Sequence, residues 1–378
     1  MTLQQIDITQ AVEQLDNSII YQMSLNSHEL FHSNLWAWLM EKDRRFISVF
    51  FPELSAAEKI RREEDNRDIT IWYDDNNAYV IENKFKSIPT EAQLISYEKK
   101  LRLENKFAKG ILTGICKPAI SIGMGALSNW SFLSYEEIAN RIDDYVLSAG
   151  EPLDTFSVNV IKQYSSMIRN LCSIVQFELE KNKDHVSQLE PPKTEKYNTI
   201  RIRDLLIKMH ADAFCAELRN DERYDKLQQS LGQDCELIIE AGFSNKSGIV
   251  DALIQVKSNN PKQEYDRRIG VQIQGNQFRL FVSLAKAGNN SSAVDLFKKY
   301  QEKDWFECYS QPPKTFKGVG TSMNPRRENN NGQFNKYESS YYWFVYQYFD
   351  IKGRHHRMTD QDVKEHIWTF LYKAKELL

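Results

Sequence analysis

The sequence lacks the long apolar run that a membrane-spanning helix requires, since no stretch approaches ~18 to 20 consecutive apolar residues. Residues 1–17 also lack the basic start and the apolar core of a signal peptide. The five cysteines are odd in number, widely scattered and without a C-x-x-C pair, which argues against a disulfide framework and against a zinc site. We therefore expect a cytoplasmic protein with reduced thiols and no membrane partner.

A strong net charge is also missing, because the formal net charge is only -3 at pH 7. With 41% hydrophobic and 27% charged residues, the composition is that of an ordinary globular protein and excludes a largely disordered chain. The charge is nevertheless uneven. Residues 1–190 carry 20 Lys and Arg against 28 Asp and Glu, whereas residues 191–378 carry 29 against 24. The basic second half is compatible with a polyanionic partner, and equally with a chance imbalance of solvated surface.

The length of 378 residues exceeds the usual range for one hydrophobic core, which predicts two domains. The most polar and irregular segment surrounds Pro191 and Pro192, so we place a linker at 186–196 between domains at 1–185 and 197–378. In the first domain, helical and strand-like patterns alternate, which predicts an α/β fold with a central mixed sheet flanked by helices. The second domain is also expected to be α/β or α+β, with nucleic-acid binding or oligomerisation as candidate roles.

A change of hydrophobic period marks the most informative part of the chain. Residues 26–42 have helical spacing, whereas residues 67–84 alternate with a period of two around turn residues at 74–77. This pattern predicts a helix followed by a β-hairpin. After Pro89 the helical period returns, with Thr90 as a candidate N-cap residue.

Three charged residues lie on the predicted hairpin: Asp68, Glu82 and Lys84. Because successive side chains of a strand point to opposite faces, Glu82 and Lys84 share one face, and the neighbouring strand can bring Asp68 beside them. Two converging carboxylates form the oxygen-rich site that Mg²⁺ prefers, and Mn²⁺ can substitute. A lysine on the same face can position a water molecule and offset charge on a phosphate. The pattern thus predicts metal-dependent phosphodiester hydrolysis; the alternative is a solvent-facing ion pair.

These residues, Asp68 followed by Glu82-Asn83-Lys84 on adjacent strands, resemble the motif of the PD-(D/E)XK nuclease superfamily. The resemblance covers residues 24 to about 115 and implies a restriction-endonuclease-like fold. Arg67 stands where the proline of the motif would be. The preceding segment "HELFHSNLWAWLM" looks like the first helix of a branch in which an acid is followed by a His-Ser pair, here Glu29 and His32-Ser33.

The resemblance implies a hydrolase in which Asp68 and Glu82 hold Mg²⁺, Glu29 completes the metal site and Lys84 is catalytic. It also implies a DNA substrate, a role in restriction or phage defence, and a homodimer or higher homo-oligomer. Gln93 and Tyr97 match the Q-x-x-x-Y element that follows the motif lysine in RecB-like nucleases, and their spacing of four places them on one helix face. Together with His32 and Ser33, they are the candidate supporting or substrate-binding residues.

Several other interpretations remain open at the level of the sequence. The first domain could be a catalytically inactive nucleic-acid-binding or assembly module that keeps the nuclease fold, or a protein-interaction domain. Glu29 has a rival role in a capping box with Asn26. His32 could be a structural hydrogen-bonding residue, and Gln93 and Tyr97 could simply pack on the sheet. The aromatic segment 341–349 fits a half-buried strand better than a platform for unpaired bases.

Overall fold

The chain forms two compact units. Unit 1 comprises Met1–Glu178 and Lys193–Met209, and unit 2 comprises Leu179–Pro192 and His210–Leu378. Unit 1 thus includes residues 193–209, most of which lie beyond the predicted linker. The computed structural model describes residues 7–25, 28–54, 57–85, 87–103, 106–148, 154–181, 195–244, 246–260, 263–286, 292–306, 335–338, 341–351 and 359–378.

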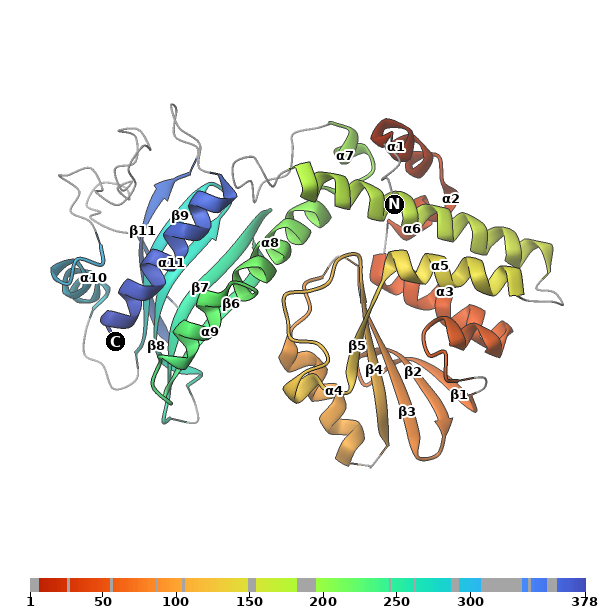
Figure 1. Cartoon of the computed structure of the whole chain (residues 1–378), viewed down its shortest axis with the longest axis horizontal. Helices are drawn as coiled ribbons and strands as arrows, with labels where there is room; N and C mark the ends of the chain where they lie inside the picture. The colour runs from red at the N-terminus through yellow and green to blue at the C-terminus, as the bar shows by residue number, and fades with distance from the viewer. Residues whose placement is uncertain are drawn as a thin grey trace. The chain divides into compact units, whose positions relative to one another are not determined.

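Unit 1 is built on a five-stranded sheet with the strand order β1-β2-β3-β4-β5 (Figure 1). Its strands are β1 (Lys59–Glu64), β2 (Arg67–Asp74), β3 (Asn77–Lys84), β4 (Phe107–Gly114) and β5 (Trp130–Ser134). Its helices are α1 (Ile8–Asp16), α2 (Ile19–Ser24), α3 (His28–Lys42), η1 (Arg44–Val49), α4 (Glu91–Leu103), η2 (Gly125–Leu127), α5 (Tyr135–Ser148), α6 (Thr155–Lys181, of which residues 155–178 belong to this unit) and α7 (Glu195–Thr199).

The sheet of unit 1 is mixed. Strands β1, β2 and β3 pair antiparallel, whereas β4 runs parallel to both β3 and β5. The predicted hairpin is confirmed, because β2 and β3 are joined by a two-residue turn at Asp75 and Asn76. Each parallel pair is connected through a segment that crosses over the sheet, and the segment between β3 and β4 contains α4.

Helices cover both faces of this sheet. Leu94, Tyr97 and Leu101 of α4 pack in one hydrophobic cluster with Ala78 and Val80 of β3. On the opposite face lie α3, which contacts β1, β2 and β3, and α5. The alternation along β3 therefore sends every second side chain toward α4 and the others toward α3 and α5.

Unit 2 contains a six-stranded sheet with the order β10-β11-β9-β8-β7-β6, in which all the pairs are antiparallel. The strands are β6 (Cys235–Ser244), β7 (Ser247–Lys257), β8 (Tyr265–Gln274), β9 (Gln277–Ala285), β10 (Asn335–Glu338) and β11 (Tyr342–Asp350). The helices are α8 (Arg203–Arg219, of which residues 210–219 belong to this unit), α9 (Glu222–Gln229), α10 (Ala293–Glu302) and α11 (Asp360–Glu376).

In unit 2, α11 packs on β7 and β8 and places Phe370 against Phe278 of β9. The aromatic segment is the strand β11, in which the buried Val345 and Phe349 alternate with the half-buried Tyr346 and Tyr348. The expectation of a half-buried strand is therefore confirmed. Both units combine helices with a β-sheet, which confirms the predicted α/β class. Within the described residues, no helix combines the length and the apolarity needed to cross a membrane.

Candidate active site

The hairpin register brings Asp68 and Glu82 together. Ile69 lies opposite Ile81 and Thr70 lies opposite Val80, so the next step of the same register places Asp68 beside Glu82. Opposed residues of an antiparallel pair point to the same face, which here is the face covered by α4. The Oδ2 atom of Asp68 also accepts a hydrogen bond of 2.6 Å from the backbone N–H of Asn83. This bond holds the Asp68 carboxylate at the end of β3.

Glu82 is anchored through one of its two carboxylate oxygens. Its Oε1 atom lies 2.8 Å from Nζ of Lys84 and accepts a hydrogen bond of 2.9 Å from Nε2 of Gln93. The Oε2 atom is buried and has no hydrogen-bond partner among the described residues. Since Glu82 is only 2% exposed, this oxygen is a buried acceptor that water does not readily satisfy.

Burial and nearby negative charges raise the pKa of both acids. Burial raises the pKa of Glu82 to about 7, and the charge of Asp68 adds to the effect. Burial likewise raises the pKa of Asp68 to about 6, although the hydrogen bond from Asn83 opposes the rise. Burial disfavours the charge of Lys84, but the adjacent Glu82 carboxylate outweighs it and raises the pKa of Lys84 above its ordinary value. Near neutral pH, the two acids are therefore partly protonated beside one ammonium group.

Glu29 reaches the same end of the sheet from α3. Its Oε1 atom accepts a hydrogen bond of 2.7 Å from the backbone N–H of Ser87. Its negative charge contributes to the raised pKa of both Asp68 and Glu82. The structure therefore brings Glu29 into the electrostatic environment of the two acids. The rival capping role involves Asn26, which lies outside the described residues.

His32 and Ser33 lie inside the protein, on the face of the sheet opposite to Glu82. His32 is fully buried, its Nδ1 atom lies 2.8 Å from the hydroxyl of Tyr164, and its ring packs on Phe85 with centroids 4.4 Å apart. The Oγ atom of Ser33 donates to the carbonyl of Glu29 at 3.1 Å. Both side chains therefore fix the position of α3, and neither faces solvent where a substrate could bind.

Gln93 and Tyr97 connect α4 to the candidate site. Nε2 of Gln93 donates both to Glu82 and, at 2.7 Å, to the hydroxyl of Tyr97. The Tyr97 hydroxyl in turn donates to the carbonyl of Asn66 at 2.6 Å, in the turn before β2. The two residues therefore join α4 to both strands of the hairpin, which gives them a supporting role.

Asn83 is a residue of this site that sequence reasoning missed. It is 1% exposed, and its Nδ2 donates to the Glu29 carbonyl at 2.8 Å and to Oγ of Ser33 at 3.2 Å. Its Oδ1 accepts from the hydroxyls of Tyr135 at 2.6 Å and Thr113 at 3.1 Å. Asn83 thereby ties β3 to α3, β4 and α5. The signal in the sequence was an amide between Glu82 and Lys84, on a strand with apolar neighbours.

Glu63 is a second residue near the candidate site that no pattern in the sequence indicated. Its charge contributes to the raised pKa of Asp68, and its φ of 53° lies in the left-handed region that non-glycine residues rarely adopt. It lies between the paired positions Arg62–Ile69 and Glu64–Arg67 of β1 and β2, directly across from Asp68. A local distortion of β1 therefore brings a further acid near the site.

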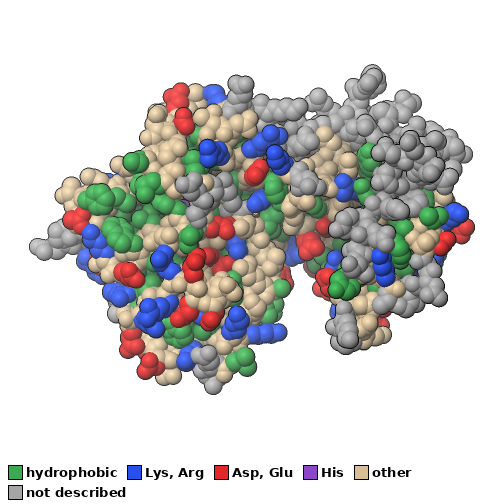
Figure 2. Space-filling view, turned by 180° about the vertical axis from the view of Figure 1, so that it is seen from behind, with side chains coloured by type: hydrophobic (Ala, Val, Ile, Leu, Met, Phe, Trp, Pro, Cys, Tyr) green, Lys and Arg blue, Asp and Glu red, His purple; other side chains and the backbone are tan. Residues whose placement is uncertain are grey.

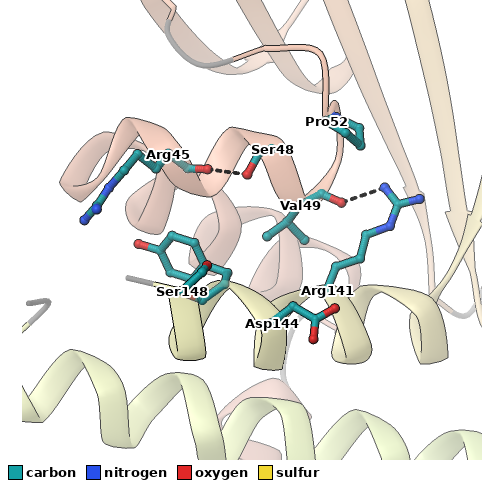
Figure 3. Close-up of a pocket in the computed structure, with 8 residues that line it drawn as sticks. Arg45, Ser48, Val49, Pro52, Arg141, Asp144 and Ser148 are labelled. Atoms are coloured by element: carbon teal, nitrogen blue, oxygen red, sulfur yellow. Dashed lines mark hydrogen bonds between the residues drawn. The ribbon is translucent and has the colours of Figure 1, made fainter. Parts of the chain in front are cut away.

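The geometry alone does not form a complete metal cage. Among the described residues, no group of three or more His, Cys, Asp or Glu side chains is arranged to hold a metal ion. A pocket of about 430 Å³ lies elsewhere in unit 1, between η1 and α5 (Figure 3). Arg141 donates there to the carbonyl of Val49, and Arg45 pairs with Asp43, so neither arginine is poised to bind an anion. The pocket contains none of the candidate site residues.

Comparison of the chain with protein families, with curated proteins and with solved structures finds no match.

We predict that the stability of unit 1 depends on pH through Glu82. Its pKa is about 7 in the folded protein and 4.5 ordinarily, so the folded state holds the proton more tightly. The contribution of Glu82 to the free energy of unfolding is then fully present below about pH 4.5 and is lost as the pH rises through 7, by up to about 3 kcal/mol. Urea unfolding at pH 5 and pH 8 without divalent ions should show this decrease for the wild type and a smaller one for Glu82→Gln. Glu41→Gln, at an exposed position of α3, is the control; an equal decrease in all three proteins would contradict the prediction.

We also predict that Asn83→Leu destabilises unit 1 by about 3 kcal/mol, because several buried hydrogen-bonding groups lose their partner at once. Asn76→Ala, at an exposed position in the hairpin turn, should change stability by less than about 0.5 kcal/mol. Chemical denaturation of both variants measures the difference. A stability for Asn83→Leu equal to that of Asn76→Ala would show that these bonds contribute little.

Proposed function

We propose that unit 1 is a metal-dependent nuclease of the PD-(D/E)XK type that hydrolyses phosphodiester bonds in DNA. The observation that carries the proposal is the placement of Asp68 and Glu82 side by side, with the Lys84 ammonium group 2.8 Å from Glu82. The mixed five-stranded sheet with helices on both faces agrees with the restriction-endonuclease-like fold that the motif implies. Burying two carboxylates beside one lysine is costly, and such perturbed groups are more common at functional sites than elsewhere.

The donor set fits a hard divalent cation. The buried Oε2 atom of Glu82 has no hydrogen-bond partner among the described residues. Burial is the main cause of the raised pKa of both Glu82 and Asp68, and the charge of Glu29 adds to it. Asp68 and Glu82 would hold Mg²⁺ or Mn²⁺, with Glu29 completing the set. When bound, the ion would lower the pKa of a water molecule and neutralise charge on the phosphate.

The protein's own groups have distinct roles in this proposal. The Lys84 ammonium group would orient the attacking water and stabilise the negative charge that develops on the phosphate. The Asn83 N–H holds the Asp68 carboxylate, and Gln93 holds Oε1 of Glu82, so that Oε2 stays available. Such fixed positions matter because small displacements of reacting groups cause large losses of rate.

One observation favours the alternative of a catalytically inactive nucleic-acid-binding module. The described residues contain no group of three or more His, Cys, Asp or Glu side chains arranged to hold a metal ion. This alternative predicts DNA binding that weakens steeply with salt, without hydrolysis that depends on a divalent ion. A role in restriction or phage defence and a homo-oligomeric state are part of the proposal through the resemblance alone.

We predict that the protein cleaves DNA in the presence of Mg²⁺ and that Lys84→Ala and Glu82→Gln each slow cleavage by at least ~100-fold. Supercoiled, linear and single-stranded DNA should be assayed side by side, with chelator as the blank. Lys100→Ala removes a charge from an exposed position of α4 and should leave the rate unchanged. Equal cleavage by the wild type and both site variants would show that Lys84 and Glu82 take no part in the hydrolysis.

Metal binding offers a test that does not depend on turnover. We predict that calorimetry detects Mn²⁺ binding to the wild type and to Glu41→Gln, but not to Asp68→Asn or Glu82→Gln. Because a carboxyl group must lose its proton to bind the ion, the affinity should increase between pH 6 and pH 8, across the pKa of about 7 of Glu82. Binding that Asp68→Asn and Glu82→Gln leave intact would place the metal elsewhere.

A further inference from the structure

The strand β1 forms one edge of the sheet in unit 1, directly beside the candidate active site. Among the described strands it pairs with β2 alone, so its outer side faces away from the sheet. Its sequence contains Lys59, Arg61 and Arg62, all of them exposed. Neither Lys59 nor Arg61 forms an ion pair with any described residue. Figure 2 shows Lys and Arg side chains interspersed with Asp and Glu side chains at the lower left, the edge of unit 1 where Figure 1 places β1.

The register shows which of these basic residues share a face with the site. Lys59 lies opposite Trp72 and Arg61 lies opposite Thr70, whereas Arg62 lies opposite Ile69. Trp72 and Thr70 alternate in phase with Asp68 along β2, so Lys59 and Arg61 belong to the face of Asp68 and Glu82. Ile69 is fully buried and points to the other face. Lys59 and Arg61 therefore face the site side, and Arg62 does not.

Distances along the strands place the two basic residues within reach of the site. Arg61 and Asp68 are diagonal neighbours across the strand pair, which puts their Cα atoms ~7 to 8 Å apart. Lys59 lies two residues further along, and the line from Lys59 to position 63, beside Asp68, spans ~13 Å. Measured along the axis of a duplex, this length corresponds to roughly four base-pair steps. A nucleic-acid strand lying along β1 would thus present successive phosphates to Lys59 and Arg61 and a further one to the acids.

We propose that Lys59 and Arg61, on the outer edge of β1, bind the phosphodiester backbone of a nucleic-acid strand next to the phosphate that is cleaved. This inference rests on the proposed function, since it assigns residues that bind the substrate strand beside the same site. We call this path along Lys59 and Arg61 the track. Two exposed cations that pair with no acid in the described part of the chain complement a polyanion, and their contacts would fix the position of the strand without reading its sequence. The competing explanation is that charges on an edge strand prevent pairing with other sheets.

The charged residues around β1 affect where along the strand a phosphate can bind. Glu64 is engaged by Arg67 and by the indole of Trp72, so it does not oppose a phosphate near Arg61. Glu63 is exposed and lies at the site end of β1, where its charge adds to those of the candidate metal ligands. At the other end, Nζ of Lys106 lies 5.6 Å from the ring centre of Trp72. At that end Lys106 adds a positive charge, and the exposed Glu58, next to Lys59, adds a negative one.

The test compares Lys59→Gln/Arg61→Gln with Arg62→Gln, a matched charge removal from the same strand on the opposite face. Binding of the full chain to duplex DNA, single-stranded DNA and RNA is measured by fluorescence anisotropy in chelator over 50 to 200 mM salt (about the range in which such binding changes most). We expect the double variant to bind about tenfold or more weakly at ~0.1 M salt and to lose about 1.8 from the slope of log affinity against log salt for the duplex. Arg62→Gln should keep the slope of the wild type. Comparison of the three nucleic acids shows whether Lys59 and Arg61 bind a duplex or a single strand.

The outcomes separate this inference from the proposed function. If the double variant binds weakly and the wild type binds well but does not cleave, the binding track holds and the nuclease proposal fails. If the wild type cleaves and the double variant binds and cleaves like Arg62→Gln, the track is wrong and the nuclease proposal holds. A wild type that binds none of the three nucleic acids overturns the track. Circular dichroism and gel filtration check that each variant is folded, and aggregation confined to the double variant would instead support the edge-protection role.

Discussion

Two neighbouring carboxylates, the half-buried Asp68 and the buried Glu82, have to coexist beside a single ammonium group, and the structure around them depends on this constraint. Like charges at such close range repel by several kcal/mol at an intermediate effective dielectric constant, and burial removes the water that would screen them. The raised pKa values of both acids express this cost. The surrounding hydrogen bonds, from the Asn83 N–H and from Gln93, offset part of it and hold both groups in fixed positions. A divalent cation would remove most of the remaining cost.

Successive side chains of β3 point to opposite faces of the sheet and have different roles. Glu82 and Lys84 point toward α4 and form the candidate site, while Asn83 points toward α3 and α5 and joins them to the sheet. A shift of the register by one residue would place Asn83 in the site and bury the two charges against α3 and α5. The buried residues of the hairpin, among them Ile69, Val80 and Ile81, oppose such a shift. The hydrophobic core thus keeps the charged groups on the correct face.

The two helices contribute to the site in different ways. α4 approaches from the side of Glu82, where Gln93 and Tyr97 touch the candidate site or the strand ends beside it. α3 approaches from the opposite face, so its buried His32 and Ser33 hold the helix while only Glu29 reaches the end of the sheet. His32 and Ser33 follow Glu29 by three and four positions, but α3 packs on the face opposite to Glu82. Their side chains therefore lie in the interior and not at the candidate site. In unit 2 all the described strand pairs of the sheet are antiparallel, in contrast to the parallel pair that follows the hairpin in unit 1.

The sequence by itself determined the α/β class, the hairpin at 67–84 and the facing of Glu82 and Lys84, because these follow from hydrophobic period and turn residues, which are local properties of the chain. It also indicated Gln93 and Tyr97, since a spacing of four fixes two side chains on one helix face. Only the tertiary structure decided that His32 is interior, that Asn83 joins four elements, and that Lys59 and Arg61 share the face of Asp68. These features depend on which face each element buries and on how the strands pair, and such contacts between distant segments are not encoded in any local pattern.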